Sequence, residues 1–195
     1  MLAGAEIQSG LSGAWRMMAG RADGLRLLDL SADGFWNSFF AILVAAPAMA
    51  LGWVMLADQV SDVQMASRGG LVVRYALRDL GTWVLPLIGF ALAAKPAGLA
   101  DRFVPYVVAS NWGSALLVWL TLPPTILAML APGATDFVTL LSLLFYGASL
   151  FLGWRLTNAA IGRGPAMASA VFAAMFVASL MVLLALQALL GLSAP

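Results

Sequence analysis

Five long stretches without a charged residue constrain this chain more than any other feature. A helix needs about 20 apolar residues, each rising 1.5 Å, to cross roughly 30 Å of hydrocarbon. The stretches run through residues 34–57, 80–94, 103–135, 137–154 and 164–192. Four are long enough to cross unaided, whereas residues 80–94 must borrow helical turns from their flanks. The sequence therefore predicts an all-α integral membrane protein, a bundle of five transmembrane helices.

The chain divides at residue 33 into an N-terminal arm (1–33) and a five-span membrane domain (34–192). Pro123–Pro124 is expected to end or bend the third stretch. A split there would leave a piece of about 11 residues, too short to cross, so five spans are favoured over six. Residues 58–70 are expected to form a loop, the only extended polar segment on their side of the membrane. The spans are placed at residues 34–57, 75–97, 103–124, 137–154 and 164–192.

The composition supports a membrane protein and excludes several kinds of chemistry. Hydrophobic residues make up 63% of the chain and charged residues 10%, against about 25% charged residues in soluble domains. Histidine and cysteine are absent, which excludes Cys/His zinc sites, iron–sulfur clusters, disulfides and Ser-His or Cys-His catalytic pairs. We expect no cofactor, no metal and no catalytic residue. A net charge of +1 gives no sign of a nucleic-acid partner.

The distribution of basic residues predicts the orientation, because they concentrate on the cytoplasmic side. A cytoplasmic N-terminus places seven basic residues inside and three outside, and it places the C-terminus in the periplasm. Nine of the ten basic residues are arginine, and alanine and glycine are abundant, which favours a GC-rich bacterial gene. We therefore expect a protein of the bacterial inner membrane. The inner residues are Arg16, Arg21, Arg26, Lys95, Arg102, Arg155 and Arg163, and the outer ones are Arg68, Arg74 and Arg78.

The arm carries an amphipathic pattern. Ile7, Leu11, Trp15 and Met18 recur at helical spacing, with polar residues largely on the other face. Such a helix can pack on the protein's own cytoplasmic face, lie on the membrane surface or bind a partner, and these placements are not exclusive. A turn is expected over residues 20–24, and Ser31 or Asp33 is expected to cap the first span.

Two groups of polar residues are candidate sites. Ser110, Asn111 and Ser114 form the densest polar cluster inside a span, and they serve either as a ligand or pore-lining patch or as interhelical hydrogen-bonding groups. Arg74 and Arg78 lie one turn apart before the short second span. They form either an anion or headgroup clamp, or arginines that snorkel or pair with Asp79, Asp58 or Asp62. No charged residue is expected in the middle of a clear span, which argues against a carboxylate proton relay.

Small residues on the fifth span are candidates for helix packing. They recur four residues apart, so they share one helix face. Small side chains let two backbones approach closely, which is how helices associate in lipid. The partner is either another helix of this chain or a helix of a second chain. The candidates are Ala166, Ala170, Ala174 and Ala178.

The layout resembles a known family. An amphipathic arm leads into Asp33-Gly34-Phe35-Trp36-Asn37-Ser38-Phe39-Phe40, followed by five spans and almost no C-terminal tail. This is similar to the bacterial branch of the Yip1-type membrane proteins, over about residues 30–192. The resemblance implies a multi-pass, non-enzymatic membrane protein that works through partners, and it assigns no functional residue.

The sequence favours a non-enzymatic scaffold or accessory subunit of a membrane assembly. Its expected partners are the lipid bilayer and a membrane protein or a second copy of the chain. The alternative is a small-solute channel or permease, alone or as an oligomer, for which Asn111, Pro47, Pro86 and the Arg74/Arg78 pair are the motivation. An enzyme acting on lipid is the third hypothesis, and it would have to use charged residues at the membrane edge.

Overall fold

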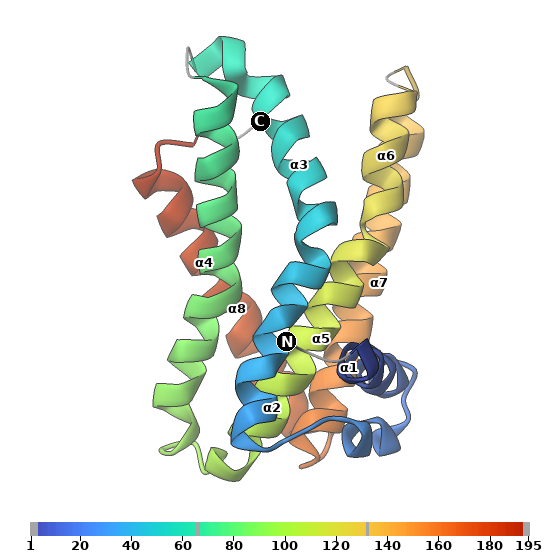
Figure 1. Ribbon diagram of the computed structural model, residues 1–195, viewed down its shortest axis with the longest axis vertical. Helices are drawn as coiled ribbons and strands as arrows, with labels where there is room; N and C mark the ends of the chain where they lie inside the picture. The colour runs from blue at the N-terminus through green and yellow to red at the C-terminus, as the bar shows by residue number, and fades with distance from the viewer. Residues whose placement is uncertain (1–3, 65–66, 132, 193–195) are drawn as a thin grey trace. The chain divides into compact units, whose positions relative to one another are not determined.

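A computed structural model describes residues 4–64, 67–131 and 133–192. Throughout this part of the chain the regular structure is helical, without a strand (Figure 1). The α-helices are α1 (Gly4–Met18), α2 (Ala32–Asn37), α3 (Ala41–Gln64), α4 (Arg68–Ala94), α5 (Phe103–Leu120), α6 (Leu122–Leu130), α7 (Thr135–Ile161) and α8 (Pro165–Leu189). Short 3-10 helices are η1 (Ala22–Leu27), η2 (Ser38–Phe40) and η3 (Ala100–Arg102).

Five helical segments are long and apolar enough to cross a membrane, which confirms the predicted number. The third segment runs through η3, α5 and α6, and its helix breaks at Thr121, directly before Pro123 and Pro124. The proline pair starts α6 rather than ending the apolar stretch, because proline is tolerated in the first turn of a helix. The segments are Ala32–Ser61, Arg68–Ala94, Ala100–Leu130, Thr135–Ile161 and Pro165–Leu189.

The expected loop over residues 58–70 is mostly helix, so that prediction is wrong. α3 continues to Gln64, and α4 begins at Arg68, where the hydroxyl oxygen of Ser67 accepts a hydrogen bond from the Gly70 amide at 3.2 Å. The second span therefore gains its missing turns at its N-terminal end. The reason for the extension is packing, because Ala57 and Val60 belong to a buried cluster that is described below.

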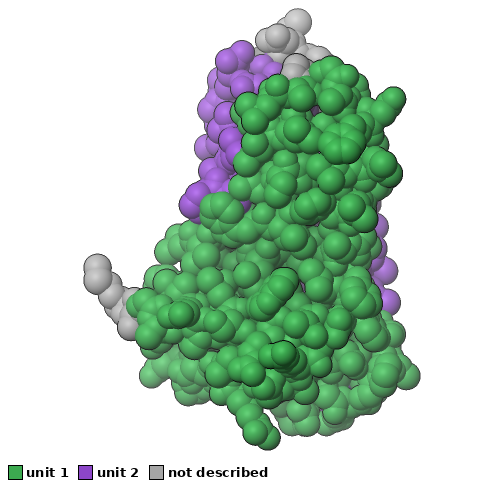
Figure 2. All heavy atoms as spheres, turned by 90° about the vertical axis from the view of Figure 1, so that its right-hand side faces the viewer, with its two compact units in different colours: residues 1–45, 101–172 green, residues 46–100, 173–195 purple. Residues whose placement is uncertain are grey.

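The described chain forms two compact units. Unit 1 comprises residues 1–45 and 101–172, and unit 2 comprises residues 46–100 and 173–195, each in its own colour in Figure 2. One boundary lies within α3, two residues before Pro47, and another lies within α8. The boundaries between these units therefore differ from the predicted boundary at residue 33 between the arm and the membrane domain.

In unit 1, α1 lies against η1, α5 and α7, so the arm packs on the chain itself (Figure 1). Its buried face holds Gly10, Gly13, Ala14, Met17 and Met18. Of the large residues in the sequence pattern, Met18 lies on this face and Ile7 and Leu11 are half-buried, whereas Trp15 is 55% exposed. Gly10 and Gly13 lie on the buried face because glycine has no side chain, so the backbone of α1 can approach its neighbours closely. A Cβ on Gly13 would lie 2.8 Å from the Gly24 carbonyl oxygen.

Three further contacts fix unit 1. The hydroxyl oxygen of Ser31 accepts a hydrogen bond from the Gly34 amide at 3.1 Å, so Ser31, one of the two expected caps, starts α2. Trp119 on α5 donates to the Val44 carbonyl at 3.0 Å. Trp154 on α7 donates to the Ser169 hydroxyl on α8 at 3.0 Å.

The core of unit 2 is a cluster from α3, α4 and the chain after α8. It consists of Ala57, Val60, Leu71, Tyr75 and Leu192, all nearly or completely buried. Burying side chains of this kind stabilises a fold by roughly 1.5–3 kcal/mol for each large aliphatic residue in water. This cluster holds the ends of α3 and α4 together beside the connection between them.

Candidate functional site

Asn111 lies at the centre of unit 1 and makes a buried hydrogen bond to a distant residue. Its amide Nδ2 donates to the hydroxyl oxygen of Ser38 at 2.9 Å, and the Ser38 hydroxyl donates to the Phe35 carbonyl at 2.7 Å. Asn111 and Ser38 are both 0% exposed. In the same cluster, the Ser110 hydroxyl donates to the carbonyl of Val107 on its own helix, and Ser114 is half-buried. This placement favours interhelical hydrogen bonding over a pore-lining patch.

A small hollow lies next to this hydrogen bond. Its volume is about 70 Å³, well below the roughly 300 Å³ of a typical small-molecule pocket. It suits a few water molecules rather than an organic ligand. Its lining residues include Glu6, Ser9, Asp29, Asn37, Ser38 and Trp112.

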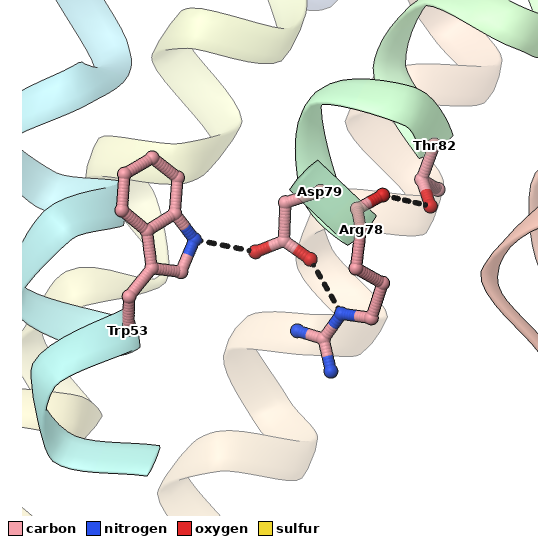
Figure 3. A network of polar contacts seen from close by, with 4 residues as sticks. All are labelled: Trp53, Arg78, Asp79 and Thr82. Atoms are coloured by element: carbon pink, nitrogen blue, oxygen red, sulfur yellow. Dashed lines mark hydrogen bonds and ion pairs between the residues drawn. The ribbon is translucent and has the colours of Figure 1, made fainter. Parts of the chain in front are cut away.

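A charged network lies within α4 in unit 2 (Figure 3). Arg78 Nε donates to Asp79 Oδ1 at 2.8 Å, and Trp53 Nε1 on α3 donates to Asp79 Oδ2 at 2.8 Å. The Thr82 hydroxyl donates to the Arg78 carbonyl one turn further on. Arg78 and Asp79 fall inside the second span as predicted at residues 75–97, next to the uncharged stretch 80–94, and within the apolar segment Arg68–Ala94.

The two arginines of the proposed clamp have different surroundings. Arg78 pairs with Asp79, and the two side chains are 14% and 27% exposed. Arg74 is exposed, and Asp58 pairs with Arg68 instead. The Arg78 contact favours the Asp-paired alternative for that residue over an anion clamp formed by both arginines.

Tyr75 adds a polar group that the sequence analysis missed. Its side chain is 1% exposed, and its hydroxyl has no hydrogen-bond partner among the residues that the structure describes. The Arg78 guanidinium carbon lies 4.8 Å from the centre of the Tyr75 ring, at the distance of a cation–π contact. The helical spacing of Tyr75 and Arg78 was the available signal, because residues three apart face the same way.

A second cavity in unit 1 lies between the end of α1 and the end of α7. Its volume is about 430 Å³, within the range of small-molecule pockets. Arg155 lines it, and one guanidinium nitrogen donates to the Ala19 carbonyl at 2.9 Å. Sequence reasoning used Arg155 only to orient the chain. Its position beside Trp154, where an apolar stretch ends, was the signal for an interfacial site.

The four alanines of the packing pattern lie on α8. Ala166, Ala170 and Ala174 are exposed and Ala178 is half-buried, whereas Ala168 and Val171 are buried. Ala166 and Ala170 are therefore not on the face through which the start of α8 packs within unit 1.

The described residues contain no group of three or more acidic side chains that would suit a metal ion. Comparison of the chain with protein-family models, with curated proteins and with solved structures finds no match. The resemblance to the Yip1-type proteins accordingly stays a prediction.

Proposed function

We propose that this chain is a non-enzymatic, multi-pass membrane protein that acts by associating with other membrane helices, as a scaffold or an accessory subunit. Five long apolar helices support insertion into a bilayer. The proposal places the protein in the bacterial inner membrane with a cytoplasmic N-terminus, for which the excess of basic residues on that side is the support. The Yip1-type resemblance implies the same kind of activity.

The observation that carries the proposal is the outward small-residue face of α8. Ala166 and Ala170 are exposed and lie on the same side of the helix, away from buried Ala168. Lipid tails pack as well against leucine as against alanine, so small residues confer no advantage toward lipid. They do allow a second helix to approach closely, and that approach stabilises association in a membrane.

The test is the oligomeric state of the intact protein in a mild detergent, measured by native mass spectrometry. We expect a second copy or a co-purifying membrane protein, and Ala170→Leu should reduce the associated fraction. Ala148→Leu is the matched control, because Ala148 is exposed on α7 and the added volume is the same. A lone monomer, or equal association of both variants and the wild type, contradicts the proposal.

The second candidate function is a small-solute channel or permease, and the Arg78–Asp79 pair inside α4 favours it. Ionisable residues within a span are costly and commonly mark a solute or ion pathway. Flux into liposomes by the wild type and by Asp79→Asn tests this candidate. Flux above that of empty liposomes, reduced in the variant, supports it, whereas flux equal to empty liposomes excludes it for the solutes tested.

A further inference from the structure

The pocket between α1 and α7 combines an apolar wall with a polar end. Met17, Phe151 and Trp154 supply large apolar surfaces, whereas Arg155 and Asn158 supply hydrogen-bond donors. Two elements far apart in the sequence build it, because Arg155 bonds to the carbonyl of Ala19, 136 positions earlier. Figure 1 shows α1 passing in front of the lower part of α7, which it contacts. The pocket lies wholly within unit 1.

Arg155 carries a charge that no carboxylate neutralises within the described chain. The ion pairs of this part join other residues, and none includes Arg155. Its guanidinium has five N–H donors, of which one bonds to Ala19, and it also lies 5.5 Å from the centre of the Phe151 ring. An uncompensated, half-buried guanidinium in a pocket is an attractive site for an anion, most of all for a phosphate.

The charge around the pocket increases this attraction. Arg102 lies beside Gly162, which lines the pocket. Arg102 and Arg163 share a single carboxylate, that of Asp101, at 3.2 Å and 2.6 Å. The Arg102 guanidinium therefore adds a second cation beside the pocket.

The outer face of α7 leads directly to Arg155. Leu140, Leu144 and Phe151 are 67%, 66% and 55% exposed. Their spacing of four and seven residues places them on one side of the helix, and Arg155 follows Phe151 by four. These residues form an apolar track along α7 that would contact lipid chains. The track ends at the Arg155 cation, beside Trp154, which marks the edge of the apolar stretch.

We propose that this pocket binds the headgroup of an anionic phospholipid, with an acyl chain lying along α7. Arg155 contacts the phosphate through its remaining N–H groups, and Asn158 donates to an ester or glycerol oxygen. The apolar track holds the chain, so an anion without a chain binds much more weakly. This inference concerns α7 and is independent of association through α8.

The test uses the intact protein in neutral detergent micelles. Thermal unfolding and native mass spectrometry are recorded with added dioleoyl phosphatidylglycerol, dioleoyl phosphatidylcholine or glycerol phosphate. Arg155→Gln removes the cation, and Ala159→Phe fills the pocket while leaving every charge in place. Arg26→Gln is the matched control, because it removes an exposed arginine that does not line the pocket.

We expect the anionic lipid to raise the melting temperature of the wild type and of Arg26→Gln, and the other two ligands to have little effect. Arg155→Gln should bind the anionic lipid about tenfold more weakly, as for one lost charge-assisted hydrogen bond. Ala159→Phe should bind it at least as weakly, because the added ring occupies the pocket. Equal binding by the wild type and Ala159→Phe would overturn the proposal even if Arg155→Gln did not fold. Equal stabilisation by phosphatidylcholine or by glycerol phosphate would also overturn it.

Discussion

The amide of Asn111 and the hydroxyl of Ser38 meet at 2.9 Å although 73 positions separate them in the sequence. This contact joins α5 to the junction of α2 and η2, where both side chains are excluded from solvent. Replacing either group by an apolar one leaves its partner buried with one hydrogen bond fewer. That loss costs more free energy than the hydrogen bond itself contributes.

Ser38→Ala should therefore lower the free energy of unfolding by about 0.5–2 kcal/mol. The measurement is reversible unfolding in mixed micelles with increasing SDS. Ser110→Ala is the control, because that hydroxyl bonds within its own helix, and a change within about 0.5 kcal/mol is expected there. Equal losses in the two variants would show that the bond between the helices contributes nothing specific.

A second prediction concerns the close approach of α1 and η1. A Cβ on Gly13 would lie 2.7 Å from Leu28 Cδ2 and 2.8 Å from the Gly24 carbonyl oxygen. The backbone contact cannot yield by rotating a side chain, so Gly13→Ala should loosen the arm at a cost of about 1–3 kcal/mol. Faster amide hydrogen exchange throughout α1 is the expected readout.

The matched variant is Gly4→Ala on the same helix, where a Cβ would meet nothing within 4 Å. Alanine has the higher helix propensity, so exchange in α1 should be unchanged or slower. Unchanged exchange in Gly13→Ala would mean that the arm does not pack as described.

The third prediction concerns the network of Trp53, Arg78 and Asp79. Asp79→Ala removes both acceptors and leaves the largely buried Arg78 unpaired, so the free energy of unfolding should fall by about 1–3 kcal/mol. Asp79→Asn keeps an acceptor for the Trp53 indole and should lose less. Unfolding monitored by tryptophan fluorescence measures both.

Asp58→Ala provides the contrast for this ion pair. Asp58 pairs with Arg68 at 3.2 Å, but both side chains are more than half exposed. Such pairs contribute about 0–1 kcal/mol. If Asp79→Ala lowered the free energy of unfolding no more than Asp58→Ala does, the network on α4 would contribute no more than an exposed ion pair.

The fourth prediction concerns acid. The Asp29 carboxylate accepts a hydrogen bond from the Ser31 amide at 2.9 Å, and the hydrogen bonds from Ser31 lower the pKa of Asp29 below its ordinary 3.8. The carboxylate therefore stabilises the start of α2 above pH 3.8, and this contribution is lost as the pH falls through the lowered pKa.

We expect amide exchange at Gly34, corrected for its intrinsic pH dependence, to accelerate in that acidic range. Asp29→Asn should remove the acceleration, whereas Asp33→Asn on the same turn should retain it. An acid response that survives in Asp29→Asn would assign the effect to another group.

The number and type of the long helices could be predicted because length and apolarity decide them locally. The end of α3 could not, because Ala57 and Val60 extend it by packing against Leu71 and Tyr75. The sequence pattern predicted the buried face of α1 only in part, because Met18 is buried but Trp15 is exposed. That pattern favours large residues such as Trp15, whereas the packing uses Gly10 and Gly13, whose lack of a side chain permits the approach.

The same distinction between local sequence and tertiary packing applies to the candidate residues. Asn111 was found because a polar side chain stands out in an apolar stretch, although its partner Ser38 was not identified. Arg155 was missed as a site because part of its surroundings comes from α1 and η1, more than 130 positions earlier in the sequence. Charged residues are common at the ends of membrane spans, so the sequence does not single out Arg155. Only the fold shows that this uncompensated cation lines a cavity with apolar walls.

The docking of α1 on α7 also sets an order of events during synthesis. The carbonyl of Ala19 is made 136 residues before Arg155, its hydrogen-bond partner. At about 5–20 residues per second, the ribosome needs roughly 7–27 seconds to produce that partner. During this interval η1 and α5 are made, so α1 can contact both of them before α7 exists. The arm thus completes its packing only after α7 has been made, and a nascent chain that stops before α7 leaves uncovered the part of α1 that would contact α7.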